Sequence, residues 1–346
     1  MAMVDLTVRG AGIFGLSIAW ACLRRGASVR IIDPGGPGAG ASGGIVGALA
    51  PHVPENWNEK KAFQFESLMM AEEFWGGVDA ASGLSSGYAR LGRLQPIADE
   101  AALAMAQARA ASAASLWKGQ AIWRVISAEQ VGAWAPQSPT GLLIEDSLSG
   151  RLHPRKACAS LAAALTARGV EIRPMAEDEG RIVHATGWQG LLELNDASRR
   201  PMGNGVKGQA ALFDYDAGDC PQLFADALHI VPHADGTVAV GSTSERDFAS
   251  PDSTDGALDD VIFRAQQAFP VLRDAPILER WAGVRPRSRS RAPMLGQHPQ
   301  RAGEFIANGG FKIGFGMAPK VAQVMADLIL EGRDAIPEGF RPEASL

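Results

Sequence analysis

The spacing of apolar residues changes twice within the first part of the chain, and each change marks an element. Residues 6–8 form a short apolar run, and residues 13–25 then carry apolar side chains at helical spacing, up to Gly26. A second apolar run ends at Asp33. Short apolar strands are typical of parallel sheets, and glycine commonly ends a helix. This order therefore predicts a β-α-β unit of about 30 residues.

The same patterns predict further elements along the rest of the chain. Helical spacing or alanine-rich composition predicts helices at 59–78, 99–117, 154–168 and 314–330. Apolar runs predict strands at 181–185 and 304–307. Between residues 208 and 243, short apolar runs alternate with turns, as in an antiparallel sheet. The chain is therefore expected to be α/β at both ends, with helices and an antiparallel sheet between them.

Composition and charge limit the classes of protein that the chain can belong to. It has 346 residues, 46% apolar and 21% charged, which suits a globular protein with two interleaved domains. Its net charge of −5 gives no reason to expect nucleic acid or an anionic membrane as a partner. No apolar run approaches the roughly 20 residues that span a bilayer, so no membrane is expected.

Two features of the sequence indicate where the protein is located: its N-terminus and its cysteines. The first nine residues lack the basic and apolar regions of a signal peptide. Cys22, Cys158 and Cys220 are odd in number and match no metal or redox spacing. We therefore expect reduced thiols in a cytoplasmic protein.

The turn after the first strand carries a dinucleotide-binding fingerprint. Gly10, Gly12 and Gly15 form a G-x-G-x-x-G pattern between the predicted strand and helix. These glycines allow a tight turn, a close approach of the backbone to a pyrophosphate, and close packing of helix on strand. The helix N-terminus attracts the diphosphate, and Asp33 can accept hydrogen bonds from ribose hydroxyls. The alternative is a glycine-rich turn that binds nothing.

This fingerprint cannot choose between NAD and FAD, which share it. Pro34 follows Asp33 and no arginine stands beside them to pair with a 2′-phosphate, so NADP is disfavoured. Arg9 stands where such strands normally carry an apolar residue, and we expect a strand end that reaches solvent. Ser42 lies in a G-x-S-x-G pattern, but a loop precedes it where a nucleophile elbow needs a strand, so a hydrolase is rejected.

Three further segments carry a resemblance to a known family. They are G-A-S-G-G-I-V-G-A-L at 40–49, W-A-G-V-R-P at 281–286 followed by P-M-L-G at 293–296, and A-N-G-G-F-K-I-G at 307–314 followed by Ala318 and Pro319. Together, and in this order, they resemble the D-amino acid oxidase and glycine oxidase family of flavoproteins, which includes sarcosine oxidases. The match spans essentially the whole chain.

The resemblance implies a fold and a division into domains. It implies an α/β fold in which a Rossmann-type FAD-binding domain is interleaved with an α+β substrate domain built on an antiparallel sheet. The FAD-binding domain is expected at residues 1–56, 146–200 and 276–346. The substrate domain is expected at residues 57–145 and 201–275.

The resemblance also implies FAD as the cofactor, and a set of residues that contact it. The cysteine that tethers flavin in sarcosine oxidases has no counterpart near Pro293, so the FAD is expected to be non-covalent. The expected FAD-binding residues are Gly10, Ala11, Gly12, Ile13, Phe14, Gly15, Asp33, Pro34, Ala41, Ser42, Gly47, Ala48, Leu49, Ala185, Thr186, Gly187, Trp188, Gly283, Arg285, Gly310, Phe311, Lys312, Ile313 and Gly314.

The chain departs from the family pattern in three places. Residues 170–185 are too few for the family's three-stranded β-meander, which leaves the contacts on the adenine side open. His229 stands where glycine oxidases have tyrosine, and Lys312 stands where they have arginine. Because these two positions shape the pocket, we expect the chain to prefer a substrate other than plain glycine.

Arg285 is the first candidate for catalysis. A guanidinium binds a carboxylate through two parallel hydrogen bonds, and the resemblance places this one over the flavin, holding the substrate carboxylate. The alternative is a solvated surface cluster, which would include the neighbouring arginines at 280, 287, 289 and 291. For those four neighbours the surface interpretation is the better one.

Lys312, His52 and His229 are the other catalytic candidates. Lys312 would add a second positive charge near the carboxylate, or it is an exposed residue on a turn. Either histidine could accept a proton from the substrate ammonium, although an isolated histidine is more often structural. His229 and His233 have a zinc-like spacing, but Pro232 between them indicates a strand, so no metal site is expected.

These residues predict the oxidation of a small amino acid or amine by hydride transfer to FAD, with O₂ as acceptor and H₂O₂ as product. One alternative is a secondary-amine oxidase or dehydrogenase of the same fold, acting on a sarcosine-like substrate. Another is a flavoprotein domain that acts on a macromolecule such as tRNA, which only the arginine cluster supports. The sequence leaves the oligomeric state open.

Overall fold

The β-α-β unit at the N-terminus is present in the computed structural model, which describes residues 4–196 and 198–346. It consists of β1 (Leu6–Arg9), α1 (Ile13–Arg24) and β2 (Val29–Ile32). β1 and β2 are parallel, with Leu6 opposite Val29. The short strands are almost wholly buried because the sheet is covered on both faces, as their continuous apolar runs require.

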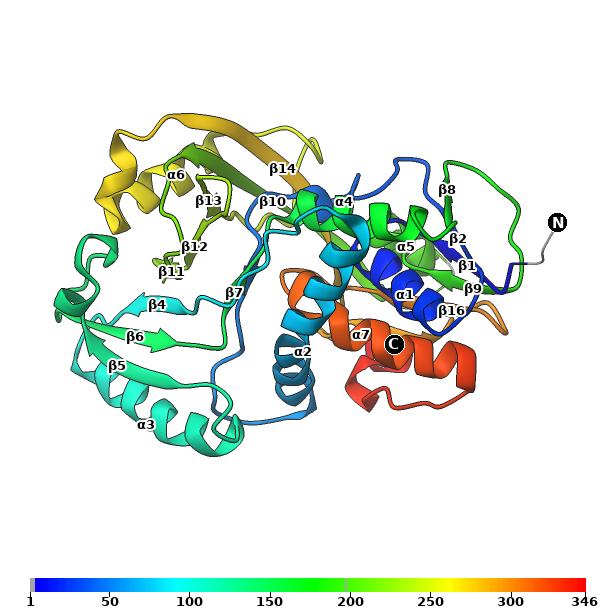
Figure 1. Ribbon diagram of the computed structural model, residues 1–346, viewed down its shortest axis with the longest axis horizontal. Helices are drawn as coiled ribbons and strands as arrows, with labels where there is room; N and C mark the ends of the chain where they lie inside the picture. Colours follow the sequence, from blue (N-terminus) through cyan, green and yellow to red (C-terminus); the bar gives the residue numbers. More distant parts are fainter. Residues whose placement is uncertain (1–3, 197) are drawn as a thin grey trace.

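This unit is the centre of a six-stranded sheet with the order β15-β16-β9-β1-β2-β8 (Figure 1). The four added strands are β8 (Glu171–Arg173), β9 (Arg181–His184), β15 (Met294–Gln297) and β16 (Phe305–Asn308). All neighbouring strands are parallel except β15 and β16. The helices of this part are α4 (Pro154–Thr166), α5 (Gly187–Asp196) and α7 (Gly314–Glu331), and α1 packs against α4 and α7.

A second sheet of eight strands has the order β14-β10-β13-β12-β11-β4-β6-β5. Its strands are β4 (Arg93–Pro96), β5 (Trp123–Ser127), β6 (Leu142–Asp146), β10 (Gly203–Asp214), β11 (Gln222–Ala225), β12 (Leu228–Pro232), β13 (Thr237–Gly241) and β14 (Ile277–Ser288). All pairs are antiparallel except β4 with β11. The expected antiparallel sheet is therefore confirmed.

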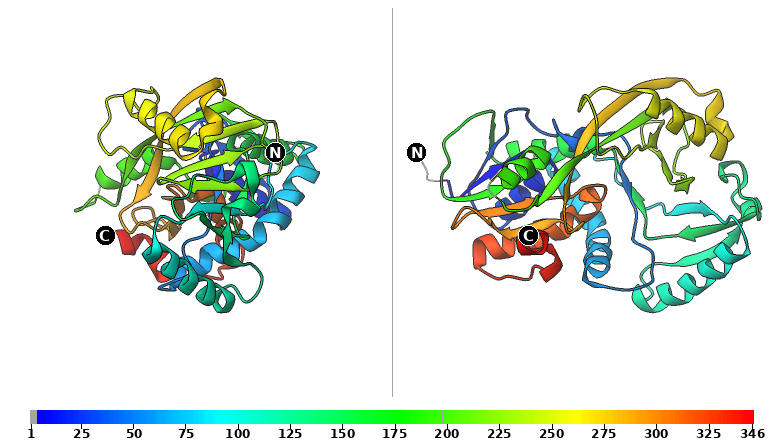
Figure 2. Two further views of the ribbon diagram at one scale, coloured as in Figure 1. Left: turned by 90° about the vertical axis from the view of Figure 1, so that its left-hand side faces the viewer. Right: turned by 180° about the vertical axis from the view of Figure 1, so that it is seen from behind.

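The two sheets lie at opposite ends of the molecule, and α2 (Glu59–Ser82) lies between them (Figure 2). α2 packs against α4 and α7. It continues four residues past the predicted end at Val78, and Gly83 ends it in a left-handed conformation with φ of 70°. The remaining long helices are α3 (Glu100–Leu116) and α6 (Gly256–Ala268), and α3 packs on β5 while α6 packs on β10 and β13.

The chain between β2 and β9 confirms that the three-stranded excursion is missing. Residues 170–185 contain β8, a short loop and β9, with no further strand between β8 and β9. The loop is fastened by Arg9, which donates to both carboxylate oxygens of Asp178, with Nε–Oδ1 and Nη2–Oδ2 distances of 2.8 Å. The arginine at the end of β1 is therefore explained, because it pairs with the loop that stands in place of the excursion.

The proposed domain boundaries stay a prediction. β14 falls within the part assigned to the FAD-binding domain, yet it pairs with β10 of the eight-stranded sheet from Ile277 to Ser288. The strand after it, β15, lies in the six-stranded sheet. β14 therefore leads the chain from one sheet to the other. No helix within the described residues is long and apolar enough to cross a membrane.

Two neighbouring histidines, with rings tilted by 42°, support the loop that follows β2. His233, only 2% exposed, lies at the end of β12 with its ring 4.7 Å from that of His153. Its Nε2 lies 3.4 Å from the carbonyl oxygen of Val46. Burial, and then the neighbouring His153, lowers the pKa of His233 to about 4. Burial also lowers the pKa of His153. Both rings are therefore neutral near pH 7.

The burial of His233 predicts a loss of stability in acid. Since its pKa is lower in the folded chain than in the unfolded one, the unfolded chain binds the proton first as the pH falls. The free energy of unfolding that depends on the neutral His233 ring is fully present above about pH 6.5 and is lost as the pH falls towards 4. Near pH 4.5 the loss is about 2 kcal/mol. Urea denaturation at pH 7 and near pH 4.5 measures this loss. In His233→Gln the loss should be smaller by about that amount, and an equal loss in both proteins contradicts the assignment.

Candidate active site

A cavity of about 1370 Å³ is lined by residues of both sheets. It is larger than the roughly 300–1,000 Å³ of most small-molecule pockets. One part of its wall comes from the carboxyl ends of β1, β2, β9 and β16, which is where parallel sheets bind ligands. The other part comes from β11, β12, β13 and β14 of the eight-stranded sheet. The cavity can therefore hold a long ligand and a second small molecule.

The fingerprint glycines lie where α1 opens onto this cavity. A Cβ on Gly10 would lie 2.3 Å from the carbonyl oxygen of Ala185, and one on Gly15 would lie 1.9 Å from that of Gly10. Gly12 begins α1 with no side-chain cap, so the positive helix end faces the cavity. Ser42 Oγ accepts a hydrogen bond of 2.9 Å from the Ile13 amide. This arrangement fits the diphosphate of a dinucleotide.

Asp33 stands beside this helix end and braces the two turns around it. Its Oδ2 accepts a hydrogen bond of 2.7 Å from the amide of Ala11, and its Oδ1 accepts one of 2.8 Å from Gly35. Each carboxylate oxygen keeps a further lone pair for a ligand hydroxyl. Asp33 lines the cavity, and its contact with a ribose stays a prediction.

Most of the predicted cofactor residues share the cavity wall. Those on the wall are Gly10, Gly12, Ile13, Phe14, Asp33, Pro34, Ala41, Ser42, Gly47, Ala48, Ala185, Thr186, Gly187, Trp188, Arg285, Gly310, Phe311, Lys312 and Gly314. Those that are not on it are Ala11, Gly15, Leu49, Gly283 and Ile313. Gly283 instead makes room for Trp281, because a Cβ there would lie 2.4 Å from the indole ring.

The structure does not bring His52 to the other candidates. Its ring is half-buried, is absent from the cavity wall, and Nδ1 is hydrogen-bonded to Gln64. The backbone amide of His52 donates to the same Gln64 oxygen at 2.7 Å. Burial lowers the pKa of this histidine. The position of His52 therefore matches the structural alternative and gives no access to a ligand.

Arg285 lies on the wall near the carboxyl end of β14. Its Nη1 donates to Ser242 Oγ at 2.8 Å, and its Nη2 donates to the carbonyl oxygens of Thr243 at 2.7 Å and Lys207 at 3.2 Å. Its Nε is buried without a hydrogen-bond partner in the described part of the chain. Burial lowers the pKa of this guanidinium to about 10, so the group stays charged. All its protein partners are neutral oxygens.

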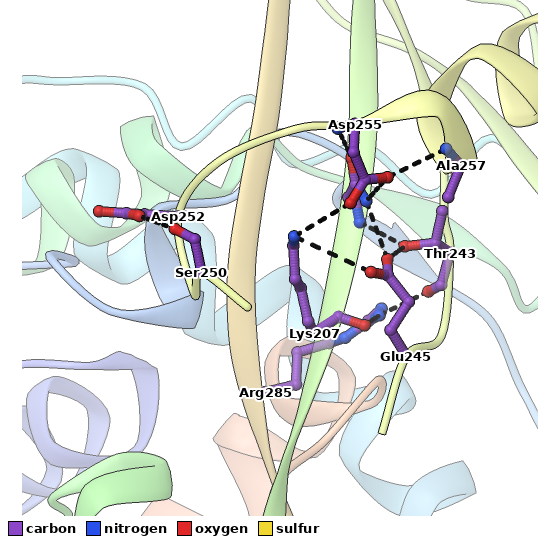
Figure 3. Close-up of polar contacts among 9 residues, drawn as sticks. Lys207, Thr243, Glu245, Ser250, Asp252, Asp255, Ala257 and Arg285 are labelled. Carbon is purple, nitrogen blue, oxygen red and sulfur yellow. Dashed lines mark hydrogen bonds and ion pairs between the residues drawn. The ribbon is translucent and has the colours of Figure 1, made fainter. Parts of the chain in front are cut away.

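A buried lysine network fixes the segment that holds Arg285 (Figure 3). Lys207 is 2% exposed, and its Nζ lies 3.6 Å from Asp255 and 3.9 Å from Glu245. Gln209 Nε2 donates to both carboxylates, at 3.0 Å to Glu245 and 2.8 Å to Asp255. Because Lys207 and Gln209 belong to β10, the chain after β13 is attached to the sheet behind Arg285.

The residues that surround the Arg285 guanidinium and fix its neighbouring segment were not predicted from the sequence. A Cβ on Gly208 would lie 1.8 Å from Arg285 Nη2, so this glycine makes room for the guanidinium. A usable signal was Lys207, a charge inside a strand of small and apolar residues, where burial requires a partner. Nothing in the sequence pointed to Glu245 as a partner of Lys207 or to Ser242 as a partner of Arg285.

Phe311 brings three cations together at the same end of the cavity. Arg285 Cζ, Arg287 Cζ and Lys312 Nζ lie 5.7, 5.5 and 5.8 Å from the centre of its ring. Lys312 is exposed on the cavity wall, yet the surrounding protein, and then the two arginines, lower its pKa to about 8. This end of the cavity is therefore strongly positive.

His229 completes this end from β12. Its Nδ1 lies 3.3 Å from Gln222 Oε1. Burial, followed by the charges of Arg93 and Lys312, lowers its pKa to about 3. The ring is therefore neutral near pH 7 and can exchange hydrogen bonds with a ligand. Residues 4–196 and 198–346 contain no group of three or more metal-ligating side chains.

Comparison with known proteins identifies the family. The family model described as DAO, FAD dependent oxidoreductase, matches residues 5–328. The bifunctional protein ThiO/ThiG of Trichormus variabilis is 25% identical over 350 residues, covering 94% of this chain and 53% of that protein. The chain thus spans about half the length of the first curated relatives that it matches. The glycine oxidase of Bacillus licheniformis is 24% identical over 94% of this chain and 93% of its own.

Solved structures have the same fold. The crystal structure of glycine oxidase from Bacillus cereus has a TM-score of 0.81 at 19% identity, covering 96% of each chain. Iminodiacetate oxidase from Chelativorans has a TM-score of 0.82 at 22% identity, covering 98% of this chain and 99% of that one. The cavity, with its fingerprint turn and open helix end, fits the cofactor of this fold. The chain belongs to the DAO family of FAD-dependent oxidoreductases, and FAD is its cofactor.

Proposed function

We propose that the protein oxidises a small amino acid or related amine that carries a carboxylate, with O₂ as the electron acceptor. The observation that carries this proposal is Arg285, a half-buried guanidinium on the cavity wall with only neutral protein partners. A buried cation without a counter-ion is costly, and a substrate carboxylate relieves that cost. FAD, when bound, supplies a hydride acceptor at N5 of its ring.

The side chains divide the work of binding and orientation. Arg285 holds the carboxylate and so restricts the orientation of the α carbon, which is a large share of catalysis. The surrounding cations disfavour an ammonium, which must lose its proton before the carbon can give up hydride. His229 is too weak a base for that proton, with a pKa of about 3, and instead offers a hydrogen bond.

The overall reaction balances with water and O₂. The substrate loses a hydride and a proton to become an imine, and water hydrolyses the imine to a 2-oxo acid or aldehyde and an amine or ammonia. O₂ takes up the two electrons and two protons and becomes H₂O₂. A dehydrogenase passes the same electrons to another acceptor and makes no peroxide. The similar fold of the L-proline dehydrogenase of P. horikoshii, at 19% identity, keeps this second candidate open to test.

We also propose that the FAD is held without a covalent bond by the wall residues named above. No cysteine lies on the described cavity wall, and Cys22 and Cys158 are buried elsewhere. Three unpaired cysteines also suit a reducing compartment, so we propose a cytoplasmic location. His229 and Lys312 both line the pocket, which supports a preference for a substrate other than glycine.

The proposal is tested by assaying the purified protein for turnover. We expect a yellow protein that releases intact FAD on acid denaturation. We also expect it to produce peroxide with at least one member of a panel of D- and L-amino acids, glycine, sarcosine and N-carboxymethyl amines. Turnover with an artificial acceptor but not with O₂ indicates the dehydrogenase. If the FAD-loaded protein oxidises nothing in the panel with either acceptor, the proposed function is wrong. If glycine is the best substrate of the panel, the expected preference for another substrate is wrong.

Replacing Arg285 by lysine tests the carboxylate anchor. Lysine keeps the charge but loses the planar fork, so we expect a loss of about 2–5 kcal/mol of transition-state stabilisation in kcat/KM. FAD binding, measured by flavin absorbance after gel filtration, should be unchanged. A variant with the kcat/KM of the parent protein shows that another group binds the carboxylate.

Gly208→Ala tests the same anchor without removing its charge. The added Cβ would lie 1.8 Å from Nη2, and the flexible guanidinium must move because the strand backbone cannot. We expect kcat/KM to fall about 10- to 100-fold, as for a small misplacement of a positioning group. The matched control is Gly256→Ala, where nothing lies within 4 Å of the new Cβ. Equal activity in the two variants would exclude a role for the position of Arg285.

A further inference from the structure

The charged groups on the cavity wall are divided unevenly between its two ends. Near the fingerprint turn, both signs are present, with Asp33 and Glu193 on the wall and Arg9 paired with Asp178. At the end formed by the eight-stranded sheet, the charged wall residues are Arg285 and Lys312, and both are positive. This end is the one assigned to the substrate.

Neither of these two cations has a counter-ion within residues 4–196 and 198–346. Glu245 acts on Arg285 electrostatically, but its carboxylate is directed at Lys207, 3.9 Å from Nζ (Figure 3). It also accepts a hydrogen bond of 3.0 Å from Gln209 Nε2. No ion pair or hydrogen bond of Lys312 is found among the described residues, and its Nζ lies 5.8 Å from the centre of the Phe311 ring. The cavity therefore carries two positive charges where one carboxylate could neutralise only one.

Other positive groups near this end are already balanced or do not reach the wall. Arg93 donates to Asp146 at 2.9 Å, within a buried pair. Arg287 contacts the Phe311 ring but is absent from the cavity wall. The excess therefore consists of Arg285 and Lys312, which lie at similar distances from the same ring, 5.7 and 5.8 Å. A short ligand can touch both, since their separation is at most about twice that distance.

We propose that Lys312 binds a second carboxylate, so that the preferred substrate is a dicarboxylic amino or imino acid. This inference rests on the proposed function and specifies its substrate class. One carboxylate pairs with Arg285 and the other with Lys312, while the amine-bearing carbon lies between them. The planar fork of Arg285 fixes the first carboxylate, and the flexible lysine accepts second carboxylates at different chain lengths.

The electrostatics of this end favour such a substrate over a neutral amino acid. A zwitterionic amino acid brings one negative and one positive charge, and its ammonium is repelled by two cations. A dicarboxylic amino acid brings a further negative charge, which offsets the repulsion between Lys312 and the neighbouring arginines. His229 and Phe224 complete the wall with a neutral polar ring and an apolar one, and neither competes for a carboxylate.

The test is a binding titration that needs no turnover. The FAD-loaded protein is titrated with succinate and with butyrate, two non-oxidisable acids of the same chain length, and binding is followed by the flavin absorption spectrum. We expect succinate to bind about tenfold more tightly, the gain from one partly exposed charged hydrogen bond. In Lys312→Gln this ratio should fall to near one. Arg289→Gln, an exposed neighbour that is absent from the wall, is the control and should keep the ratio.

Turnover separates this inference from the proposed function. Peroxide formation with aspartate and asparagine of both hands, and with iminodiacetate and sarcosine, should favour the dicarboxylic member of each pair, and Lys312→Gln should abolish that preference. Turnover that favours the neutral members, with equal binding of succinate and butyrate, overturns the second-carboxylate site and leaves the proposed function intact. If Lys312→Gln lowers the flavin reduction potential but keeps the succinate-to-butyrate ratio, Lys312 serves the flavin and the inference is wrong. Failure of every substrate overturns the proposed function itself.

Discussion

The site depends on a guanidinium that is held by neutral oxygens. Arg285 donates to a serine hydroxyl and to two backbone carbonyls, so it is fixed in direction while its charge stays available. A carboxylate in the same place would hold it as firmly and would cancel the charge that a substrate needs. The carboxylate nearest in effect, Glu245, is taken up by Lys207, whose burial requires a negative partner. Lys207 thus occupies the carboxylate of Glu245, and Arg285 is left without a counter-ion in the described part of the chain.

This arrangement requires the two sheets to be held in a fixed position relative to each other at the cavity. β14 carries Arg285 in the eight-stranded sheet and then leads the chain to β15 in the six-stranded sheet. The turn after β16 returns to the same strand, because the amide of Phe311 donates to the carbonyl oxygen of Pro286 at 2.9 Å. Gly309 allows this approach, since a Cβ there would lie 2.9 Å from Ser288 Oγ. The aromatic ring and the anchor are therefore positioned by one backbone contact between the two sheets.

The sequence predicts the features that depend on residues close together in the chain, and it does not predict those that depend on distant residues. The β-α-β unit, the open N-terminus of α1 and the absence of the excursion before β9 follow from residues that are neighbours in sequence, and the structure agrees with all three predictions. Gly283 and His52 were expected at the site because of neighbouring motifs, but Gly283 accommodates Trp281 and His52 bonds to Gln64. Whether a residue reaches the cavity is decided here by its packing partners, the Trp281 ring for Gly283 and the Gln64 amide for His52, and short motifs do not specify such partners. The partners of Arg285 come from β10 and from the segment after β13, so only the pairing of distant strands reveals them.

The positive end of the cavity also bears on how an amine would lose its proton. His229 was a candidate proton acceptor, but its pKa of about 3 makes it a poor base. The two causes after burial are the charges of Arg93 and Lys312, and Lys312, which lies on the wall, acts on any ammonium bound nearby in the same direction. The field that weakens the histidine therefore also lowers the pKa of the substrate ammonium. For an amine substrate, as proposed, these charges would destabilise the protonated form, and water would accept the proton in place of a strong base of the protein.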